Sequence, residues 1–438
     1  VIGLKNKYTF RNLSDFKFTA EINGDGETLK TWNFDDVSAA PGETVQVTFE
    51  PFADAKPGVE YFVNVRAYLK NQDGLVDAGT ELAAEQFVLP VFVSGPKMNM
   101  DEMAAITTSE TDNSITVSGE GFSVTFDKKQ GVITSFKKGE TEFIHSGLVP
   151  NFWRAPIDND FGNNLHKRSR VWREAGKTRQ LVSVDLSRNS KWQESGKTRS
   201  PSTSGNVENN AQVTFDFNLV NEAGEPIAKY NTVYTVFGSG DVIVENQFKM
   251  TKDELPEIVR MGMNLVMPRQ FDQMTWLGRG PHESYQDRKT SAFVGLYKGS
   301  VADQYWAYLR PQENGNKTDV RWATVTNSEG TGLLFVGMPL LEVSAHHNLL
   351  EDFESMERTD GRQREGEVVV NRHINDVKPG DHTSVNIDYK QMGVGGDDSW
   401  GAWTHEQYRL TGKEYKYSFR MKAITAGEKP EEVAKLKL

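Results

Sequence analysis

A glycine-rich stretch near the end of the chain, residues 392–403, brings together side chains suited to holding a sugar. Its members are Gly393, Gly395, Gly396, Asp397, Asp398, Ser399 and Trp400. Three glycines within four residues permit tight turns and close backbone approaches that a Cβ atom would forbid. An indole held on such a polar loop can stack on the apolar face of a pyranose while neighbouring polar groups reach its hydroxyls. The stretch therefore indicates a binding loop with Trp400 at its tip, partly open to solvent.

The same residues also have a purely structural interpretation. Trp400 and Trp403 could fill a corner of a β-sandwich core while Asp397 and Asp398 cap a turn. Even in the binding interpretation we expect Trp403 to pack in the core. The alternating run 385–389 precedes the loop and would deliver it from the edge of a sheet.

A second polar cluster, residues 151–162, contains Arg154, Asp158, Asp160 and Gly162. The two aspartates suggest a calcium loop, but an EF-hand-like loop needs a further oxygen ligand where Gly162 stands and a glutamate where Ser169 stands. We therefore predict no metal site. The favoured interpretation is an ion pair between Arg154 and a carboxylate that clamps the loop.

Two further polar segments lie at residues 277–288 and 303–322. The first contains Gly278 and Gly280, but Glu283 takes the place of the third glycine of a dinucleotide fingerprint and no helical pattern follows. Dinucleotide binding is therefore excluded. The second segment is dense in polar and aromatic residues, as a ligand groove or a subunit contact would be.

The sequence offers no convincing catalytic set. A retaining glycosidase needs two carboxyl groups about 5 to 5.5 Å apart, and Glu222, in the pair Asn221-Glu222, falls in a predicted turn between two strands. Nor is there the strand–helix alternation of a barrel of about 250 residues. His346 and His347 beside Glu351 could perform acid–base chemistry, but we expect them to pack against a helix-like segment. No catalytic residue is predicted in this chain.

Short alternating strands separated by turn residues must position these groups. The pattern predicts an all-β fold with an immunoglobulin-like β-sandwich over residues 1–90, a linker over 91–113, a large antiparallel double sheet over 114–424 and a C-terminal tail over 425–438. Helical spacing is limited to residues 171–175 and to Leu349, Leu350, Phe353 and Met356.

Composition narrows the possible partners. The chain of 438 residues carries a net charge of −11 and has no basic stripe, which argues against nucleic acid and anionic membranes. It lacks cysteine, so disulfides and thiolate metal sites are excluded. No apolar run approaches the roughly 20 residues of a membrane span. Because the chain begins at Val1 without a Met or a leader pattern, we expect a piece of a longer protein, cytoplasmic or periplasmic.

Four ordered motifs carry a family resemblance: N-F-W-R-A-P-I-D-N-D from residue 151, G-R-G-P-H-E-S-Y-Q-D-R from 278, P-Q-E-N-G from 311 and M-G-V-G-G-D-D-S-W from 392. The chain resembles the C-terminal portion of the large bacterial β-galactosidases of glycoside hydrolase family 2. The resemblance implies that residues 114–424 form a supersandwich shared with galactose mutarotases, that the preceding sandwich is a spacer, and that the tryptophan of the last motif reaches into the active site.

For function, the resemblance implies a non-catalytic region that completes the substrate pocket and supports assembly of a homo-oligomeric enzyme acting on terminal β-D-galactosides with retention. Trp400 would contact substrate, with Asp397, Asp398 and Ser399 beside it. The catalytic glutamates, on a barrel, and the magnesium and sodium ligands common in the family would lie upstream. Three alternatives stay open: a sugar epimerase of the mutarotase type using His346 or His347, an independent carbohydrate-binding module, and a purely structural assembly domain.

Overall fold

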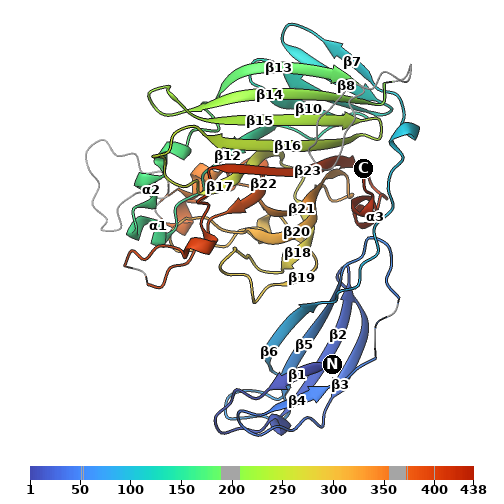
Figure 1. The fold of residues 1–438 in the computed structure, drawn as a ribbon, viewed down its shortest axis with the longest axis vertical. Coiled ribbons are helices and arrows are strands. Elements are labelled where there is room, and N and C mark those ends of the chain that lie inside the picture. The colour runs from blue at the N-terminus through green and yellow to red at the C-terminus, as the bar shows by residue number, and fades with distance from the viewer. Residues whose placement is uncertain (51, 53, 189–207, 355–370, 372, 399) are drawn as a thin grey trace. The chain divides into compact units, whose positions relative to one another are not determined.

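The computed structural model describes residues 1–438 except 51, 53, 189–207, 355–370, 372 and 399 (Figure 1). The chain divides into two units, one formed by residues 1–98 and 431–438 and the other by residues 99–430. Both are built almost wholly from antiparallel strands, which confirms the predicted all-β class. Every helix in the described part of the chain is too short or too polar to cross a membrane.

The first unit holds a two-stranded sheet, β1-β4, and a four-stranded sheet in the order β3-β2-β5-β6. Its elements are β1 (Ile2–Lys5), η1 (Leu13–Asp15), β2 (Phe16–Gly24), β3 (Glu27–Phe34), β4 (Thr44–Val47), β5 (Tyr61–Leu69) and β6 (Glu81–Val88). Ala20, Ile22 and Val63 are buried in its core. Six strands thus stand among the described residues where about seven were predicted. Residues 431–438, in the predicted tail, group with this unit, and Lys435 there pairs with Asp25 at 2.9 Å.

The second unit holds a five-stranded sheet, β11-β10-β9-β8-β7, and a twelve-stranded sheet whose main path runs β12-β17-β22-β21-β23-β16-β15-β14-β13. Strand β20 branches from β21 and continues through β18 to β19. The strands are β7 (Thr107–Glu110), β8 (Ser114–Gly119), β9 (Phe122–Asp127), β10 (Val132–Lys138), β11 (Thr141–Glu142), β12 (Ser146–Asn151), β13 (Gln180–Arg188), β14 (Asn210–Val220), β15 (Pro226–Phe237), β16 (Asp241–Met250), β17 (Arg260–Pro268), β18 (Gln273–Gly280), β19 (Phe293–Ser300), β20 (Lys317–Thr326), β21 (Gly332–His346), β22 (His382–Gln391) and β23 (Glu414–Ile424).

The two sheets of this unit enclose its main core. Phe126 on β9 contacts Phe215 on β14 and Tyr234 on β15, with ring centroids 6.2 and 5.1 Å apart. Figure 1 shows strands β13 to β16 of the twelve-stranded sheet running side by side. Strand β7 lies within the predicted linker yet pairs with β8, so the sheet begins before residue 114. Glu222 lies in the turn between β14 and β15, as predicted.

Helical segments are few and short. They are α1 (Asp158–Gly162), α2 (Leu165–Arg168), α3 (Pro430–Lys435), η2 (Met100–Glu102), η3 (Arg170–Trp172), η4 (Ala302–Gln304), η5 (Leu350–Phe353), η6 (Ile374–Asp376) and η7 (Glu406–Tyr408). The sequence pattern missed α1 and α2. Of the predicted helical stretches, 171–175 overlaps η3, and 349–356 gives the single turn η5, with Met356 outside the described residues.

One part of the large sheet, formed by β17, β22 and β21, has an apolar and a polar face. Met263, Ile387 and Val343 pair across the three strands and are buried in the core. Because side chains alternate between the faces of a strand, the next row, Asn264, Asn386 and Ser344, faces the other way. The polar face is nevertheless largely enclosed, because loops cover it.

Candidate functional site

The loop that carries Trp400 leaves the end of β22. That strand pairs with both β17 and β21, so the loop starts from an interior strand and the expected edge position is wrong. The Trp400 side chain is 91% exposed, which rules out the core interpretation for this residue. Asp398 Oδ1 accepts hydrogen bonds from the Trp400 amide at 2.8 Å and the Ala402 amide at 3.2 Å. Asp398 therefore shapes the turn beneath the exposed indole.

The other predicted members of the loop have different surroundings. Asp397 is exposed and pairs with Nε2 of His405 at 2.8 Å, so it binds a neighbouring side chain and not the loop amides. Ser399 lies outside the described residues. Trp403 is 45% exposed, and the guanidinium groups of Arg168 and Arg409 lie 3.7 and 4.6 Å from its ring centroid. The expectation that Trp403 packs in the core is wrong, because the ring is half exposed and contacts two cations.

The root of the loop is fixed by Asp287, which belongs to the 277–288 motif. Its carboxylate accepts hydrogen bonds from the amides of Val394 at 3.0 Å and Gly395 at 2.6 Å. A Cβ atom on Gly393 would lie 2.6 Å from the Asp287 carboxyl carbon and 2.8 Å from Thr404 Cγ2. Glycine is therefore required at Gly393 because the carboxylate approaches the backbone so closely.

A buried ion pair holds the same root from the other side. Arg154, 1% exposed, contacts both carboxylate oxygens of Asp160 at 3.1 Å, which confirms the predicted clamp. Its guanidinium also donates to the carbonyl oxygens of Met392 at 2.5 Å and Gly393 at 3.1 Å. Asp160 accepts a further bond from the Ile157 amide at 3.1 Å. The 151–162 motif and the Trp400 loop are thus one rigid assembly.

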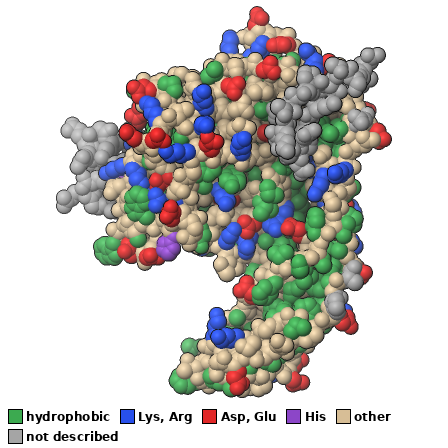
Figure 2. All heavy atoms as spheres, in the orientation of Figure 1, with side chains coloured by type: hydrophobic (Ala, Val, Ile, Leu, Met, Phe, Trp, Pro, Cys, Tyr) green, Lys and Arg blue, Asp and Glu red, His purple; other side chains and the backbone are tan. Residues whose placement is uncertain are grey.

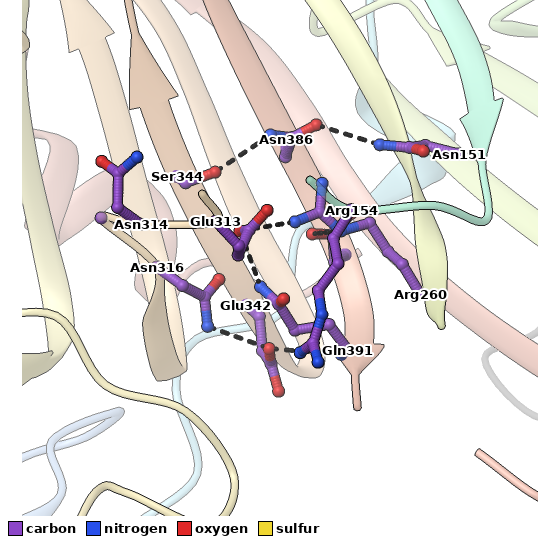
Figure 3. A network of polar contacts seen from close by, with 12 residues as sticks. Asn151, Arg154, Arg260, Glu313, Asn314, Asn316, Glu342, Ser344, Asn386 and Gln391 are labelled. Carbon is purple, nitrogen blue, oxygen red and sulfur yellow. Dashed lines mark hydrogen bonds and ion pairs between the residues drawn. The ribbon is translucent and has the colours of Figure 1, made fainter. Parts of the chain in front are cut away.

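Beneath this assembly, the polar sheet face carries buried charges (Figure 3). Arg260 on β17 pairs with Glu313 at 2.7 Å and with Asp388 on β22 at 3.4 Å. Burial raises the pKa of the Asp388 carboxyl well above its usual range, although Arg260 opposes that shift. Burial likewise raises the pKa of Glu342 on β21 to about 7. At neutral pH the cluster is therefore partly protonated.

The 303–322 segment covers that face and supplies partners to it. Besides Glu313, it provides Asn316, whose Nδ2 donates to Glu342 at 3.0 Å. Gln391, the last residue of β22, donates through its amide to Glu342 at 3.3 Å and through its side chain to Glu313 at 3.2 Å. Since Met392 and the loop follow directly, the charged cluster fixes the position from which the loop departs.

His346, the last residue of β21, lies on the same face as Ser344, and both histidines of the pair are closed off. His346 is 5% exposed, its Nε2 lies 3.0 Å from the Asn314 carbonyl oxygen, and its ring packs on Phe353 of η5. Burial lowers its pKa to about 4. His347 is also buried, with Nδ1 3.0 Å from the His382 carbonyl oxygen. Glu351, the neighbouring carboxylate of the predicted acid–base set, forms an ion pair with Lys177 instead.

Three residues that build the site were not singled out from the sequence: Arg260, Glu342 and Asp388. A signal existed for Asp388, because the run 385–389 alternates polar and apolar residues and so marks a strand with a polar face. The sequence carries no such signal for Arg260, which lies within an apolar run, or for Glu342. On the face shown in Figure 2, acidic and basic side chains are interspersed, in keeping with a chain that lacks a basic stripe.

Comparison with known proteins agrees with the motifs. A family model described as "Beta galactosidase small chain" matches residues 118–421, and one described as "Beta-galactosidase, domain 4" matches residues 2–90. A β-galactosidase of Priestia megaterium is 35% identical over 426 residues, covering 96% of this chain and 37% of the relative. A β-galactosidase of Pseudoalteromonas haloplanktis is 27% identical over 438 residues, covering 96% of this chain and 38% of the relative. The chain thus spans little more than a third of the length of these relatives.

Among solved structures, a galactose 1-epimerase from Lactobacillus acidophilus aligns with 73% of this chain and 98% of its own, at 9% identity and a TM-score of 0.33. A TM-score this low does not establish a shared fold. The family matches, in contrast, cover both units of the chain in order. This chain therefore belongs to the β-galactosidase small-chain family, with a β-galactosidase domain 4 preceding the small-chain region.

Proposed function

We propose that this chain is the non-catalytic C-terminal region of a family 2 β-galactosidase that hydrolyses terminal β-D-galactosides with retention. Its Trp400 loop would form one wall of the sugar site, with Asp397, Asp398 and Ser399 beside the ring. The catalytic barrel, its two glutamates and the magnesium and sodium ligands would lie upstream in the same polypeptide, and the enzyme would be a homo-oligomer that this region helps to assemble.

One observation carries the proposal: Trp400 is 91% exposed while hydrogen bonds from Asp287, Arg154 and Asp398 fix the backbone that holds it. An exposed tryptophan on a mobile loop would lose conformational entropy on binding a ligand. Here Asp287, Arg154 and Asp398 have already fixed the loop backbone. The loop is therefore preorganised to present an aromatic face, which suits the apolar face of a pyranose.

The test is Trp400→Ala in the full-length enzyme. An aromatic contact contributes about 0.5 to 1.5 kcal/mol beyond area burial, so KM and the constants of galactose-like inhibitors should rise roughly two- to tenfold. Trp400→Phe should lose less, and the melting temperature should not change. Trp403→Ala is the matched control from the same loop. Because Trp403 contacts two guanidinium groups, that variant should lower the melting temperature and leave KM nearly unchanged.

Unchanged KM and inhibitor constants in Trp400→Ala, together with a melting temperature lower by many degrees, would show that the residue is structural. A second experiment tests the non-catalytic assignment. The purified chain should not hydrolyse a chromogenic β-galactoside, and turnover that follows the protein through chromatography would overturn that assignment.

We do not favour an epimerase. Acid–base transfer in ring opening works best when a histidine titrates near the working pH and reaches the sugar, whereas His346 is enclosed and its pKa is lowered to about 4. Polarimetry of fresh α-galactose should therefore show little mutarotation by this chain. A rate that disappears in His346→Ala or His347→Ala would support the epimerase. Concentration-dependent oligomerisation without sugar binding would support a purely structural assembly domain.

A further inference from the structure

A second part of the polar sheet face lies under a cavity of about 440 Å³, within residues 99–430 and distinct from the Trp400 loop. Strands β12 and β17, the start of β22, η5 and residues 173–177 surround it. None of the residues that hold Trp400 lines it. A volume of this size falls in the range of small-molecule sites, which is about 300 to 1,000 Å³.

Two carboxamides, those of Asn151 and Asn264, line the cavity. Asn264 Nδ2 donates to Asn386 Oδ1 at 3.0 Å and to the Ser384 hydroxyl at 2.9 Å, and Asn151 Nδ2 lies 3.4 Å from the same Asn386 oxygen (Figure 3 shows the Asn151 contact). Among the described residues, none donates a hydrogen bond to Asn264 Oδ1. Both carboxamides are thus oriented by Asn386. Asn151 Oδ1 accepts a hydrogen bond from the Trp153 backbone amide at 3.1 Å, whereas Asn264 Oδ1 keeps its capacity to accept one from a ligand.

The wall of the cavity is largely apolar. Val149 and Val266 flank Asn264, and Phe152, Trp153 and Leu350 lie around them. Trp153 is itself held in place, because its Nε1 donates to Glu354 at 2.9 Å. Apolar walls with a few oriented polar groups match a molecule that has an apolar face and a rim of hydroxyls.

The charged residues around the cavity are paired with one another. Arg173 contacts both carboxylate oxygens of Glu354, with Nε at 3.1 and 3.0 Å, and Lys177 pairs with Glu351. Two cations therefore balance two carboxylates. An adjoining hollow contains Arg179, whose Nη1 and Nη2 donate to the Gly176 and Gln130 carbonyl oxygens. The balance of charge between these two ion pairs favours an uncharged ligand, because an ionic ligand would have to break one of them.

We propose that this cavity is a second carbohydrate site, which binds a neutral hexose or its glycoside through the Asn151 and Asn264 carboxamides. It is independent of the role proposed for Trp400. A small polar ligand in a partly open cavity gains little net free energy after its loss of freedom, so the affinity should lie in the millimolar range.

The experiment is a titration of this chain with D-galactose, D-glucose and lactose, followed by ligand-observed NMR and calorimetry. Two variants address the cavity: Asn264→Ala removes the amide, and Val149→Phe fills the space without touching the amides. Each should weaken binding about tenfold or more. Glu222→Gln, in the exposed turn between β14 and β15, is the control and should leave this affinity unchanged. If Val149→Phe lowers the melting temperature, Ser146→Trp at the exposed rim replaces it.

Three outcomes would overturn the proposal. The first is that none of the three sugars shows saturable binding up to about 100 mM. The second is binding that Trp400→Ala abolishes and Val149→Phe leaves intact, which would place the sugar on the Trp400 loop. The third is tighter binding of glucose 6-phosphate than of glucose, with the same loss in the cavity variants, which would assign the cavity to an anionic ligand.

Discussion

The two ends of the polar sheet face are built from different groups. At the end near the Trp400 loop, Arg260, Glu313, Asp388 and Glu342 are buried. Arg260 pairs with Glu313 and Asp388, and Glu342 accepts hydrogen bonds from Asn316 and Gln391. At the other end, Asn151 and Asn264 line a cavity. Buried charges lose hydration that only close partners can replace, so the charged end must be densely packed. Amides cost less to leave partly solvated, so the other end can stay open. The same sheet thus supports a rigid loop at one end and a candidate pocket at the other.

The largest effect is expected from Arg260→Met. Removing the cation leaves Glu313 and Asp388 buried without their countercharge, so the free energy of unfolding of the 99–430 unit should fall by about 3 to 5 kcal/mol. The comparison variant at the amide end, Asn264→Leu, should cost only about 1 to 2 kcal/mol, because it removes neutral hydrogen bonds. Denaturant unfolding of both variants measures the difference. Equal losses would mean that the buried charges of one end contribute no more to stability than the amides of the other.

The charged end should also make stability depend on pH. The pKa of Glu342 is about 7 in the folded chain and near 4.5 when unfolded. The folded state therefore binds the proton more tightly, so the stabilising contribution is complete below about pH 4.5 and is lost as the pH rises through about 7. Relative to Glu342→Gln, the wild-type chain should lose stability on the order of 1 to 3 kcal/mol between pH 5 and pH 8. The measurement is the free energy of unfolding of both proteins as a function of pH. Parallel profiles would contradict the role given to Glu342.

A smaller loss is expected where the charged end grips the loop. In Gly393→Ala the new methyl group would meet Asp287 at 2.6 Å, so the carboxylate must shift away from the Val394 and Gly395 amides. The cost should be about 1 to 3 kcal/mol, with a rise in hydrogen exchange across residues 393–396. Gly3→Ala is the control, because its Cβ would meet Thr44 Cγ2 at an ordinary 3.5 Å. Unchanged exchange in Gly393→Ala would show that Asp287 does not anchor the loop.

The smallest effects separate the two aspartates at the loop tip. Asp398→Ala removes the acceptor for the Trp400 and Ala402 amides and should cost about 1 kcal/mol locally, seen as several-fold faster hydrogen exchange of these amides. Asp397→Ala removes only an exposed pair with His405 and should change stability by less than about 0.5 kcal/mol. A larger loss of stability in Asp397→Ala than in Asp398→Ala would mean that the Asp397–His405 pair shapes the loop tip.

Much of the fold follows from local patterns. Alternation in the runs that became β9, β14 and β23 predicted strands with one buried face, and the glycine turn at residues 238–241 predicted that β15 and β16 are antiparallel neighbours. The short helices α1 and α2 escaped prediction because they lie within the dense polar 151–169 region and are too short to show a period. Strand β7 also escaped prediction, because three of its four residues are exposed and so carry no facial pattern.

The candidate site was predictable only in part. The exposed position of Trp400 and the Arg154 clamp follow from residue types and close spacing, since Asp160 is only six residues from Arg154. The position of Trp403 did not follow, because the two arginines that contact it come from separate segments. Arg168 precedes β13, and Arg409 lies between β22 and β23.

The sequence by itself determined that the chain is all-β, that an aromatic loop follows a strand with a polar face, and which family motifs occur. Only the tertiary structure decided what holds that loop. Asp287 lies 107 residues from Val394, and Arg154 lies 238 residues from Met392. The alternation of a strand fixes which of its side chains share a face. It does not specify which distant loops cover that face, because that depends on the order in which the strands pair.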